Sequence, residues 1–358
     1  MIKTNFSIAV MPGDGIGPEV IHATLEVLQP LCSRFDITFD YRNYDFGAAF
    51  YRRTGRTISV AEMDEIGRYD AVLFGAMGLP DVRKPDGTEV GPQVDMRAHF
   101  GLFASLRPAR LYPGVPTRVK ADAIDMLVIR ETTEGMFAGI NDVVQPSDES
   151  MSDRMTITRS NSVRLFELAF RQARQRKARG TPGHVTLLHK SNALRSQVLL
   201  ERVFDEVAAR HRDIGSAKFY IDAGAMYFVT NPERYDVVVA ENIFGDIVSE
   251  VGAGVVGGLG VAPSGDVSES RGVFQPSHGS APDIAGQGLA NPIATMLSAA
   301  MMLEWLASQH QQAQCVSAAR ALEAAVTKVL REGPRPRDLG GSANTAEVTR
   351  AVIAALPT

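Results

Sequence analysis

The stretch "AVMPGDGIGPEV", residues 9–20, decides between two possible folds. A short apolar run ends at Met11, glycines follow at every second position, and a helix-like segment begins behind them. The fingerprint of a Rossmann dinucleotide-binding fold requires G-x-G-x-x-G/A at such a point, with an acidic residue about 20 residues further on. Asp36 and Asp40 lie near that distance, but the glycine spacing here is G-x-G-x-G. The stretch therefore predicts a strand that turns into a helix, without a complete fingerprint.

The charges in this turn also count against a pyrophosphate site. Pro18 suits the first position of a helix, where the missing N–H is not needed, and Glu19 suits the positively polarised helix start. Asp14 and Glu19, however, place negative charge where a pyrophosphate would lie. We expect a tight structural turn that can still border a site.

Composition and charge narrow the class of protein. The chain has 358 residues, of which 45% are hydrophobic and 22% are charged, which is typical of a globular protein with two domains or one large α/β body. The formal net charge of −4 provides no basic field for nucleic acid or an anionic membrane. Cys32 and Cys315 lack the spacing of a metal site. We expect a cytoplasmic protein without a leader or a membrane span.

Short β-like runs alternate with helix-like stretches, which favours an α/β fold with a largely parallel sheet. The tail is helical, and "DRMTIT", residues 153–158, alternates as a half-exposed strand does. The expected elements are Ser7–Met11, Pro18–Gln29, Ile37–Tyr41, Ala71–Phe74, Met126–Ile129, Val163–Arg176, Val185–Leu188, Arg195–Ala209, Val237–Ala240, Ala294–Leu306, Val316–Leu330 and Thr345–Leu356.

Three arginines indicate an anionic ligand. Arg97 and Arg107 bracket "RAHFGLFASLR", and Arg130 ends the apolar strand "MLVIR". An arginine matches a carboxylate with two parallel hydrogen bonds, so three converging guanidinium groups suit a small di- or tricarboxylate. Each arginine alone would equally fit an exposed surface.

Three carboxylates indicate a hard cation. Asp246 and Glu250 in "ENIFGDIVSE" share one helix face, and Asp222 follows another strand in "YIDAGAM". Such oxygen ligands suit Mg²⁺ or Mn²⁺, although a solvated acidic face explains the first two equally well. Lys190 in "LLHKSN" directly follows a buried strand and could act as a base near a metal, although most lysines are merely solvated.

The loop from Pro276 to Pro292, "PSHGSAPDIAGQGLANP", is rich in small residues and exposes backbone N–H groups that can hold phosphate oxygens. His278, Asp283 and Asn291 are its polar residues. Taken alone it is only a candidate binding loop.

Taken together, these motifs resemble the β-decarboxylating dehydrogenase family, whose members act on isopropylmalate, isocitrate, homoisocitrate, tartrate or D-malate. The resemblance covers nearly the whole chain in order: "GDGIGPEV", "RAHFGLFASLRPARLYPG", "RETTEGMFAGI", "HKSNAL", "ENIFGDIVSE", "HGSAPDIAGQGLANP" and "RDLGGSANT".

The resemblance implies a two-domain α/β isopropylmalate/isocitrate dehydrogenase-like fold, and not a Rossmann dinucleotide fold. Residues 1–102 plus 258–358 would form the large cofactor-binding domain, and residues 103–257 a dimerisation domain in which "DRMTIT" belongs to a β arm. NAD would then be held by His278, Gly279, Ser280, Ala281, Pro282, Asp283, Ile284, Asn291 and Asp338.

The resemblance also implies roles for the other candidates. Arg97, Arg107 and Arg130 would bind the substrate carboxylates, and Asp222, Asp246 and Glu250 the Mg²⁺ or Mn²⁺. Lys190 and Asp222 would serve the site of the other subunit of a homodimer. The chemistry implied is hydride transfer from C2, loss of CO₂ and protonation at C3.

Several positions depart from the family pattern. Phe137 replaces a tyrosine thought to help protonate C3, Glu250 replaces the usual Asp, and Gln275 replaces a common Glu. The segment before Arg97 carries Val90, Gln93 and Val94, where isopropylmalate enzymes have a Glu and two leucines, so the substrate contacts Gln93 and Val94 match neither isopropylmalate nor isocitrate enzymes well.

We therefore expect an NAD- and divalent-metal-dependent dehydrogenase of a 3-isopropylmalate-type 2-hydroxy dicarboxylate. Tartrate, D-malate or isocitrate is the alternative, because Gln93 offers hydrogen bonds. A catalytically silent ligand-binding paralogue is the alternative from a different class, supported by Phe137 alone.

Overall fold

The computed structural model describes residues 3–139, 150 and 152–357, and the chain divides into two compact units. Unit 1 comprises Met1–Gly101, Tyr112–Pro116 and Val256–Thr358, and unit 2 comprises Leu102–Leu111 and Thr117–Val255. The short segment Tyr112–Pro116, expected in the middle domain, belongs to unit 1.

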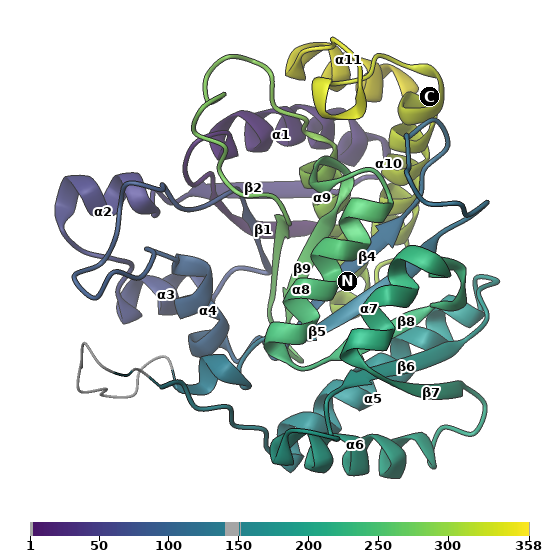
Figure 1. Ribbon diagram of the computed structural model, residues 1–358. Helices are drawn as coiled ribbons and strands as arrows, with labels where there is room; N and C mark the ends of the chain where they lie inside the picture. The colour runs from purple at the N-terminus through teal and green to yellow at the C-terminus, as the bar shows by residue number, and fades with distance from the viewer. Residues whose placement is uncertain (1–2, 140–149, 151, 358) are drawn as a thin grey trace. The chain divides into compact units, whose positions relative to one another are not determined.

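Unit 1 is built around strands in the order β2-β1-β3-β10-β9, all parallel except that β9 runs antiparallel to β10 (Figure 1). Its C-terminal strand β10 therefore pairs with β3 from the N-terminal segment. Its strands are β1 Asn5–Met11, β2 Thr38–Asn43, β3 Ala71–Phe74, β9 Pro263–Val267 and β10 Gly272–Pro276. Its helices are α1 Gly17–Arg34, α2 Ala48–Thr54, α3 Val60–Ile66, α4 Pro92–Phe100, α9 Ile293–His310, α10 Ala313–Glu332 and α11 Thr345–Ala355, with short 3₁₀ turns η3 Leu259–Val261 and η4 Arg337–Leu339.

Unit 2 is built around strands in the order β4-β5-β8-β6-β7, parallel except for the β4–β5 pair. Its strands are β4 Ala104–Arg110, β5 Asp125–Glu131, β6 His184–His189, β7 Gly215–Tyr220 and β8 Val237–Ala240. Its helices are α5 Arg159–Lys177, α6 Arg195–Ala208, α7 Ile221–Thr230 and α8 Asn242–Val255, with short 3₁₀ turns η1 Met136–Gly139 and η2 Pro232–Arg234.

The predicted alternation of strands and helices is confirmed, and the strand patterns explain it. β8, "VVVA", and β3, "AVLF", are buried at every position, as apolar strands covered on both faces are. In unit 1, α9 is buried over most of its length and packs against β10 and α10. The hydrophobic core of each unit thus lies between its strands and the helices that cover them.

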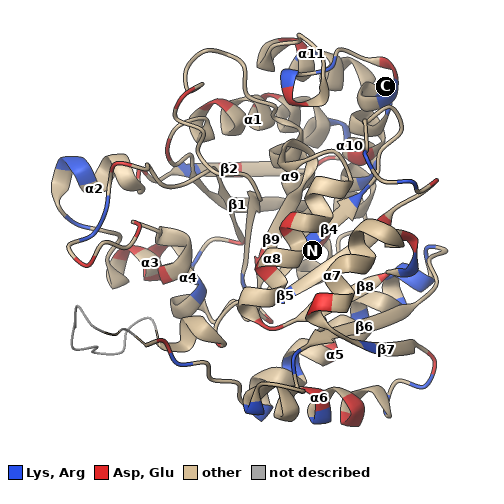
Figure 2. Ribbon diagram, viewed as in Figure 1, with Lys and Arg blue, Asp and Glu red and all other residues tan. Residues whose placement is uncertain are grey.

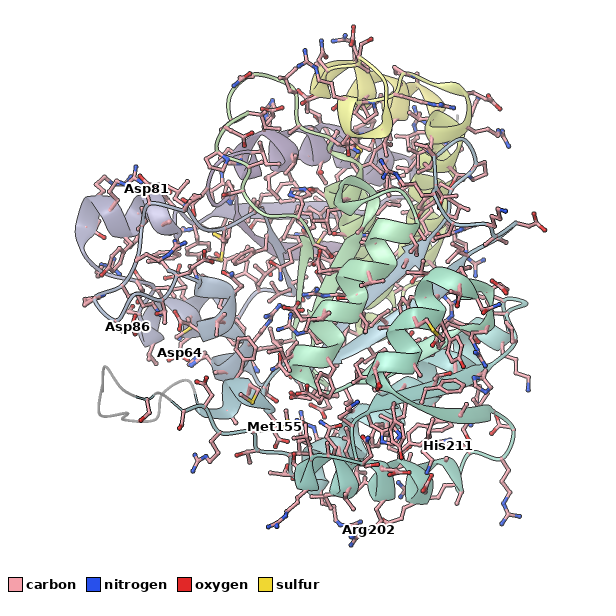
Figure 3. The ribbon with its side chains drawn as sticks, viewed as in Figure 1. Asp64, Asp81, Asp86, Met155, Arg202 and His211 are labelled. Atoms are coloured by element: carbon pink, nitrogen blue, oxygen red, sulfur yellow. The ribbon has the colours of Figure 1, made fainter. Side chains whose placement is uncertain are left out.

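The prediction of a strand over "DRMTIT" is wrong. Among its residues only Thr156 forms a β-bridge, with Gly135, and the rest has no regular structure. The Met155 sulfur accepts from the Ser196 hydroxyl of α6 at 3.2 Å, so this segment is fixed by side-chain contacts to α6 rather than by a ladder (Figure 3). The β arm that the resemblance implies was placed on this same segment, whose described residues form no strand.

Charged residues of both signs are interspersed along the ribbon (Figure 2); examples are Arg52 and Arg53 on α2 and Glu62, Asp64 and Glu65 on α3. Within the described part of the chain, no helix is both long enough and apolar enough to span a lipid bilayer.

Candidate functional site

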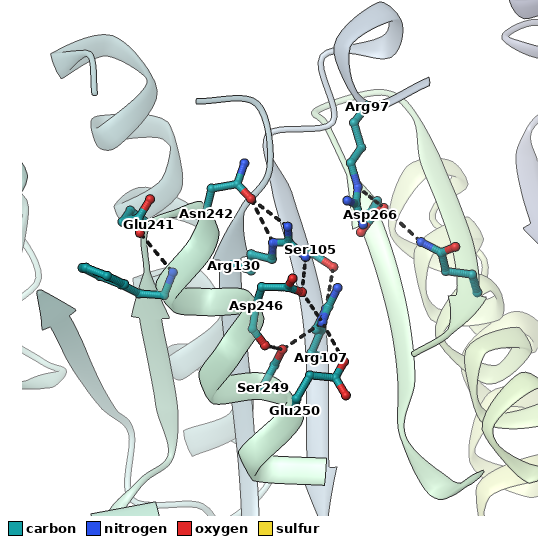
Figure 4. A network of polar contacts seen from close by, with 12 residues as sticks. Arg97, Ser105, Arg107, Arg130, Glu241, Asn242, Asp246, Ser249, Glu250 and Asp266 are labelled. Carbon is teal, nitrogen blue, oxygen red and sulfur yellow. Dashed lines mark hydrogen bonds and ion pairs between the residues drawn. The ribbon is translucent and has the colours of Figure 1, made fainter. Parts of the chain in front are cut away.

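The neighbouring strands β4 and β5 of unit 2 bring two of the predicted arginines together (Figure 4). In the antiparallel β4–β5 pair, Ser105 lies opposite Arg130. Arg107 is two residues further along β4 and so points to the same face of the sheet. Strand β8 pairs with β5 and places Ala240 beside Arg130. Helix α8 begins just after Ala240 and therefore lies directly over both guanidinium groups.

Asp246 is the carboxylate that joins these arginines. Its Oδ1 accepts from Arg107 Nη1 at 3.1 Å and also from Arg130 Nη1. Arg107 further donates to the Ser249 hydroxyl at 2.9 Å, and its Nη1 lies 3.5 Å from Glu250 Oε1. The arginine side chains are 11% and 4% exposed, whereas those of Asp246 and Glu250 are 41% and 43% exposed. The acids therefore face solvent over two buried cations.

Asn242 completes this cluster and was missed from the sequence. Its Oδ1 accepts from Arg130 Nε at 3.0 Å and Nη2 at 2.8 Å, which fixes the guanidinium plane. Asn242 is four residues before Asp246, so helical periodicity alone places both on one face of α8. That periodicity was the available signal.

The charges of this cluster balance, with two guanidinium groups against two carboxylates. A substrate dianion alone would upset that balance in a half-buried site, whereas a dianion entering with a divalent cation would preserve it. Burial raises the pKa of Glu250, partly offset by Arg107. The oxygen donors of Asp246 and Glu250 fit the preference of Mg²⁺ and Mn²⁺.

The third predicted metal ligand lies elsewhere in unit 2. Asp222 is in the first turn of α7, where its Oδ1 accepts from Lys190 Nζ at 2.9 Å, and this bond lowers the pKa of the Asp222 carboxyl. Strands β6 and β7 are parallel neighbours with His189 opposite Tyr220, so the residues just after them meet. In the described ranges no three His, Cys, Asp or Glu side chains gather as a metal site. One chain thus supplies Asp246 and Glu250 at one place, and Lys190 and Asp222 at another.

Arg97 belongs to unit 1, on α4, where it forms a buried ion pair. Its Nε donates to Asp266 Oδ2 of β9 at 2.8 Å, and Gln275 Nε2 of β10 donates to the same oxygen at 3.2 Å (Figure 4). Asp266 was missed from the sequence, because a lone acid in "PSGDV" carries no local signal of burial.

The segment before Arg97 divides between core and site. Val90 is 2% exposed and packs in a cluster with Ala48 and Val82. Gln93 and Val94 are half-buried in the first turn of α4, and Gln93 shares a helix face with Arg97. The carbonyl oxygen of Gln93 is buried without a donor among the described residues.

A cavity of about 240 Å³ lies within unit 1. Four of the predicted cofactor residues line it, namely His278, Ile284, Asn291 and Asp338, together with Ile16, Gly260, Leu289, Ala290 and Arg337. The other five, Gly279, Ser280, Ala281, Pro282 and Asp283, belong to the adjoining loop and are not among its lining residues.

Two features of this cavity fit an adenosine group. His278 Nδ1 is 2.9 Å from the Gly279 carbonyl, which makes it the N–H donor and leaves Nε2, buried without a partner among the described residues, as an acceptor for an amino or hydroxyl group. Asn291 Nδ2 donates to Asp338 Oδ2 at 3.0 Å. A Cβ on Gly260 would lie 2.0 Å from that oxygen, so only glycine leaves room for the pair.

The opening turn "GDG" is structural in this chain. Asp14 is 3% exposed, and its carboxylate accepts hydrogen bonds from the backbone N–H groups of Ala48, Ala49 and Gly78. Its negative charge is therefore stabilised within the protein. Gly15 has φ +57°, and a Cβ there would lie 1.9 Å from the Ser280 carbonyl oxygen. The turn therefore packs against Ser280, near the beginning of the Pro276–Pro292 loop.

Phe137, in η1, is half-buried, and the Arg130 guanidinium carbon lies 5.7 Å from the centre of its ring. Its phenyl group therefore borders the arginine–carboxylate cluster without offering a proton.

Comparisons with known proteins agree over nearly the full length. The family model of isocitrate/isopropylmalate dehydrogenase matches residues 7–352. A 3-isopropylmalate dehydrogenase of Thermobifida fusca is 40% identical over 360 residues, covering 97% of both chains. A 3-isopropylmalate/3-methylmalate dehydrogenase of Methanocaldococcus jannaschii is 40% identical over 347 residues, covering 96% of this chain and 97% of that protein. The crystal structure of isocitrate dehydrogenase from Methylococcus capsulatus is 31% identical, with a TM-score of 0.86 and coverage of 98% and 99%.

Proposed function

Since this chain belongs to the isocitrate/isopropylmalate dehydrogenase family and is a hydroxy acid dehydrogenase, we propose that it oxidises a 2-hydroxy dicarboxylate of the 3-isopropylmalate type with NAD and a divalent metal ion, and that decarboxylation follows. The observation that carries this proposal is the cluster of Arg107 and Arg130 against Asp246 and Glu250.

Arg107 and Arg130 bind the substrate carboxylates in this proposal. Both guanidinium groups are already oriented, Arg130 by Asn242 and Arg107 by Ser249, so little side-chain entropy is lost on binding. Asp246 and Glu250 hold the cation beside them. When bound, Mg²⁺ or Mn²⁺ would acidify the C2 hydroxyl and stabilise negative charge that develops on the substrate oxygens. Arg97, held by Asp266, supplies the third guanidinium.

The cavity of unit 1 takes the adenosine half of NAD, and the nicotinamide ring of the same cofactor would accept the hydride from C2. His278 Nε2 accepts from a hydroxyl or amino group, and Asp338 is kept in place by Asn291. Ile16, Ile284 and Leu289 supply apolar contacts for a flat base.

Lys190 and Asp222 serve the site of a second subunit. Lys190 Nζ, in its neutral form, takes the proton of the C2 hydroxyl, and the Asp222 carboxylate orients the lysine. Support comes from its separation from Asp246 and Glu250 in one chain, and from apolar side chains exposed on the adjoining helices: Met226 and Val229 on α7 are each 52% exposed, and Ile247 on α8 is 57% exposed. Such residues suit the interface of a homodimer.

Gln93 favours a second candidate, a substrate with a polar group at C3 such as tartrate, malate or isocitrate. Its buried carbonyl oxygen has no donor within the part of the chain that the structure describes, and Val90 is packed in the core and leaves no apolar contact there for the substrate. A hydroxyl group on the substrate would satisfy that carbonyl after a rotation of the side chain, whereas an isopropyl group would leave it unpaired.

The test is reduction of NAD⁺ with a panel of purified 2-hydroxy dicarboxylates, carrying alkyl, hydroxyl, carboxymethyl or no group at C3, with and without Mg²⁺. Turnover with 3-alkylmalates favours the first candidate, and turnover restricted to polar substrates favours the second. Binding of the panel by calorimetry without any turnover would identify a silent ligand-binding paralogue and overturn the proposal.

A further inference from the structure

Unit 2 encloses a small cavity of about 10 Å³ that the proposed chemistry does not use. It is lined by Glu131, Glu134, Asn161 and Glu241, together with Gly135, Ser162 and apolar side chains. This volume is about that of one water molecule. The cavity lies behind the start of α8: a Cβ on Gly135 would be 2.5 Å from Glu241 Oε2.

Two oxygen atoms in this cavity lack hydrogen-bond partners. Glu241 Oε2 and Asn161 Oδ1 have no hydrogen-bond donor among the residues that the structure describes. Both residues are buried, with exposures of 1% and 6%. The nearby donors are already used, because Asn161 Nδ2 donates to Glu131 Oε1 at 2.9 Å and the Ser162 hydroxyl donates to the Thr158 carbonyl at 2.7 Å. Burying two unpaired acceptors is costly, so the cavity requires something that donates.

The neighbouring acid is better supplied. Glu131 Oε1 accepts from the N–H and hydroxyl of Thr133 at 2.6 and 2.7 Å, as well as from Asn161. Burial raises the pKa of Glu131, but these donors act in the opposite direction and stabilise its ionised form. Glu241 has backbone donors at its other oxygen, with Phe244 N at 3.0 Å. Glu131 has more donors to hold a negative charge than Glu241 has. The hydrogen bonds therefore favour a proton on Glu241 rather than on Glu131.

We propose that Glu241 is a positioning residue, whose protonated carboxyl group donates to one water enclosed in the cavity, and that this water donates to Asn161 Oδ1 and so ties the start of α8 to α5. The water oxygen then accepts the carboxyl hydrogen and Asn161 Oδ1 accepts one hydrogen of the water, so neither of the two oxygens is left without a partner. Burial raises the pKa of Glu241, and the charge of Glu131 raises it further.

The tie matters because of the residue that follows. Asn242 donates to the Glu134 carbonyl at 2.9 Å and accepts from two nitrogens of Arg130. The carboxyl group of Glu241 caps the same helix turn through Phe244 N. The position of Asn242, and with it the plane of the Arg130 guanidinium, therefore depends on how firmly the start of α8 is held.

The charges that face Glu241 set its pH dependence. Glu131 and Arg130 lie on β5, Glu134 lies on the turn after it, and the contribution of α5 is the uncharged Asn161. Ionising Glu241 would place a second charge beside Glu131. The unfolded chain ionises in the ordinary glutamate range while the folded chain keeps its proton, so stability falls as pH rises above that range.

The test compares Glu241→Gln and Glu241→Ala in the full-length protein, with Glu233→Gln, at an exposed site of the same unit, as the matched control. The glutamine keeps a donor and the shape, so KM for the hydroxy acid should stay within about threefold. The alanine removes the tie, so KM should rise by about tenfold with a smaller change in kcat, because a binding residue is displaced. The control should change neither.

Two readouts do not depend on the proposed function. Infrared spectra of wild type at neutral pH should show a protonated-carboxyl band that shifts in D₂O and loses intensity in Glu241→Gln but not in Glu233→Gln. Urea unfolding should lose stability less steeply with rising pH in Glu241→Gln than in wild type.

Absence of a protonated-carboxyl band in wild type would overturn the proposal even if the variants fail to fold. So would stabilisation of wild type, but not of Glu241→Gln, by K⁺ or NH₄⁺ over Na⁺, because it would show that a cation occupies the cavity. Equal KM values for Glu241→Ala and wild type would exclude a positioning role.

Discussion

Arg97 and Asp266, 169 residues apart in the sequence, form an ion pair inside unit 1 with 2.8 Å between Nε and Oδ2. Their side chains are 10% and 1% exposed. An arginine proposed to bind substrate is thus oriented by an acid that no local motif indicates, and Gln275 contributes a further donor to that acid.

Replacing Asp266 with alanine should lower the free energy of unfolding by about 3–5 kcal/mol, because the Arg97 charge stays buried without its partner. Urea denaturation monitored by circular dichroism measures the change. Asp81→Ala is the matched control: it breaks the Arg52–Asp81 pair, whose side chains are 53% and 73% exposed, and should cost about 0–1 kcal/mol. Similar losses in both variants would mean that the buried pair is not specially stabilising.

Asp246→Asn keeps the size of the side chain but removes one charge from the proposed cation site. We expect turnover to fall by about 100-fold or more, with weaker Mg²⁺ and Mn²⁺ affinity in metal titrations. Asp64→Asn, at an exposed acid of α3, is the control (Figure 3). Full activity of wild type in EDTA would show that Asp246 and Glu250 have a structural role only.

Phe137 offers no proton for C3, so release of the decarboxylated product should lag behind NADH formation in wild type. A positioned acid contributes about 10²–10⁴ in rate, so Phe137→Tyr should shorten that lag. NADH and the decarboxylated 2-oxo acid, which is complete only after protonation at C3, are followed together on the natural substrate. Simultaneous appearance of both products in both proteins, at unchanged rates, would exclude position 137 from the acid step.

The cofactor preference should be NAD⁺ over NADP⁺, since Asp283 would repel a 2′-phosphate. Asp283 is exposed and directly precedes Ile284, which lines the cavity. Asp283→Lys should therefore narrow the gap in kcat/KM between the two cofactors, and Gln287→Lys on the same loop serves as the control. Comparable kcat/KM for both cofactors in wild type would contradict the proposed discrimination.

A site shared between subunits predicts complementation. Lys190→Ala and Asp246→Asn should each be nearly inactive alone, but refolding them together in equal amounts should restore about a quarter of wild-type activity, because half of the dimers then contain one intact site. Two Lys190→Ala preparations mixed in the same way are the control. No recovery in a mixture that forms mixed dimers would place Lys190 and Asp246 in separate functions.

Local patterns were sufficient wherever the chemistry depends on neighbours in the sequence. The alternation of apolar runs predicted β3 and β8 at their observed bounds, and the spacing of Asp246 and Glu250 predicted a common helix face. The fold as a whole followed from the ordered set of motifs. The carboxyl ends of β6 and β7 then explain why Lys190 and Asp222 meet.

Long-range burial was not predictable in this way. Glu131, Glu241 and Asp266 are charged residues that a sequence pattern assigns to the surface, yet each is at most 5% exposed, because other segments of the fold cover it. "DRMTIT" shows the opposite error, since a two-residue period predicts a strand only if another strand is available for pairing. Its hydrogen-bonding partners are instead Glu134, Gly135 and α6.

The discontinuity of unit 1 has a consequence for synthesis on the ribosome. All segments of unit 2 have been synthesised once residue 255 has left the ribosome. Strand β3, by contrast, can pair with β10 only after about 200 further residues have been added to it. Until then the edge of β3 that later pairs with β10 has no partner strand, and all residues of β3 are apolar. A truncation that removes β10 would therefore leave one edge of β3, in the N-terminal segment, without its partner strand.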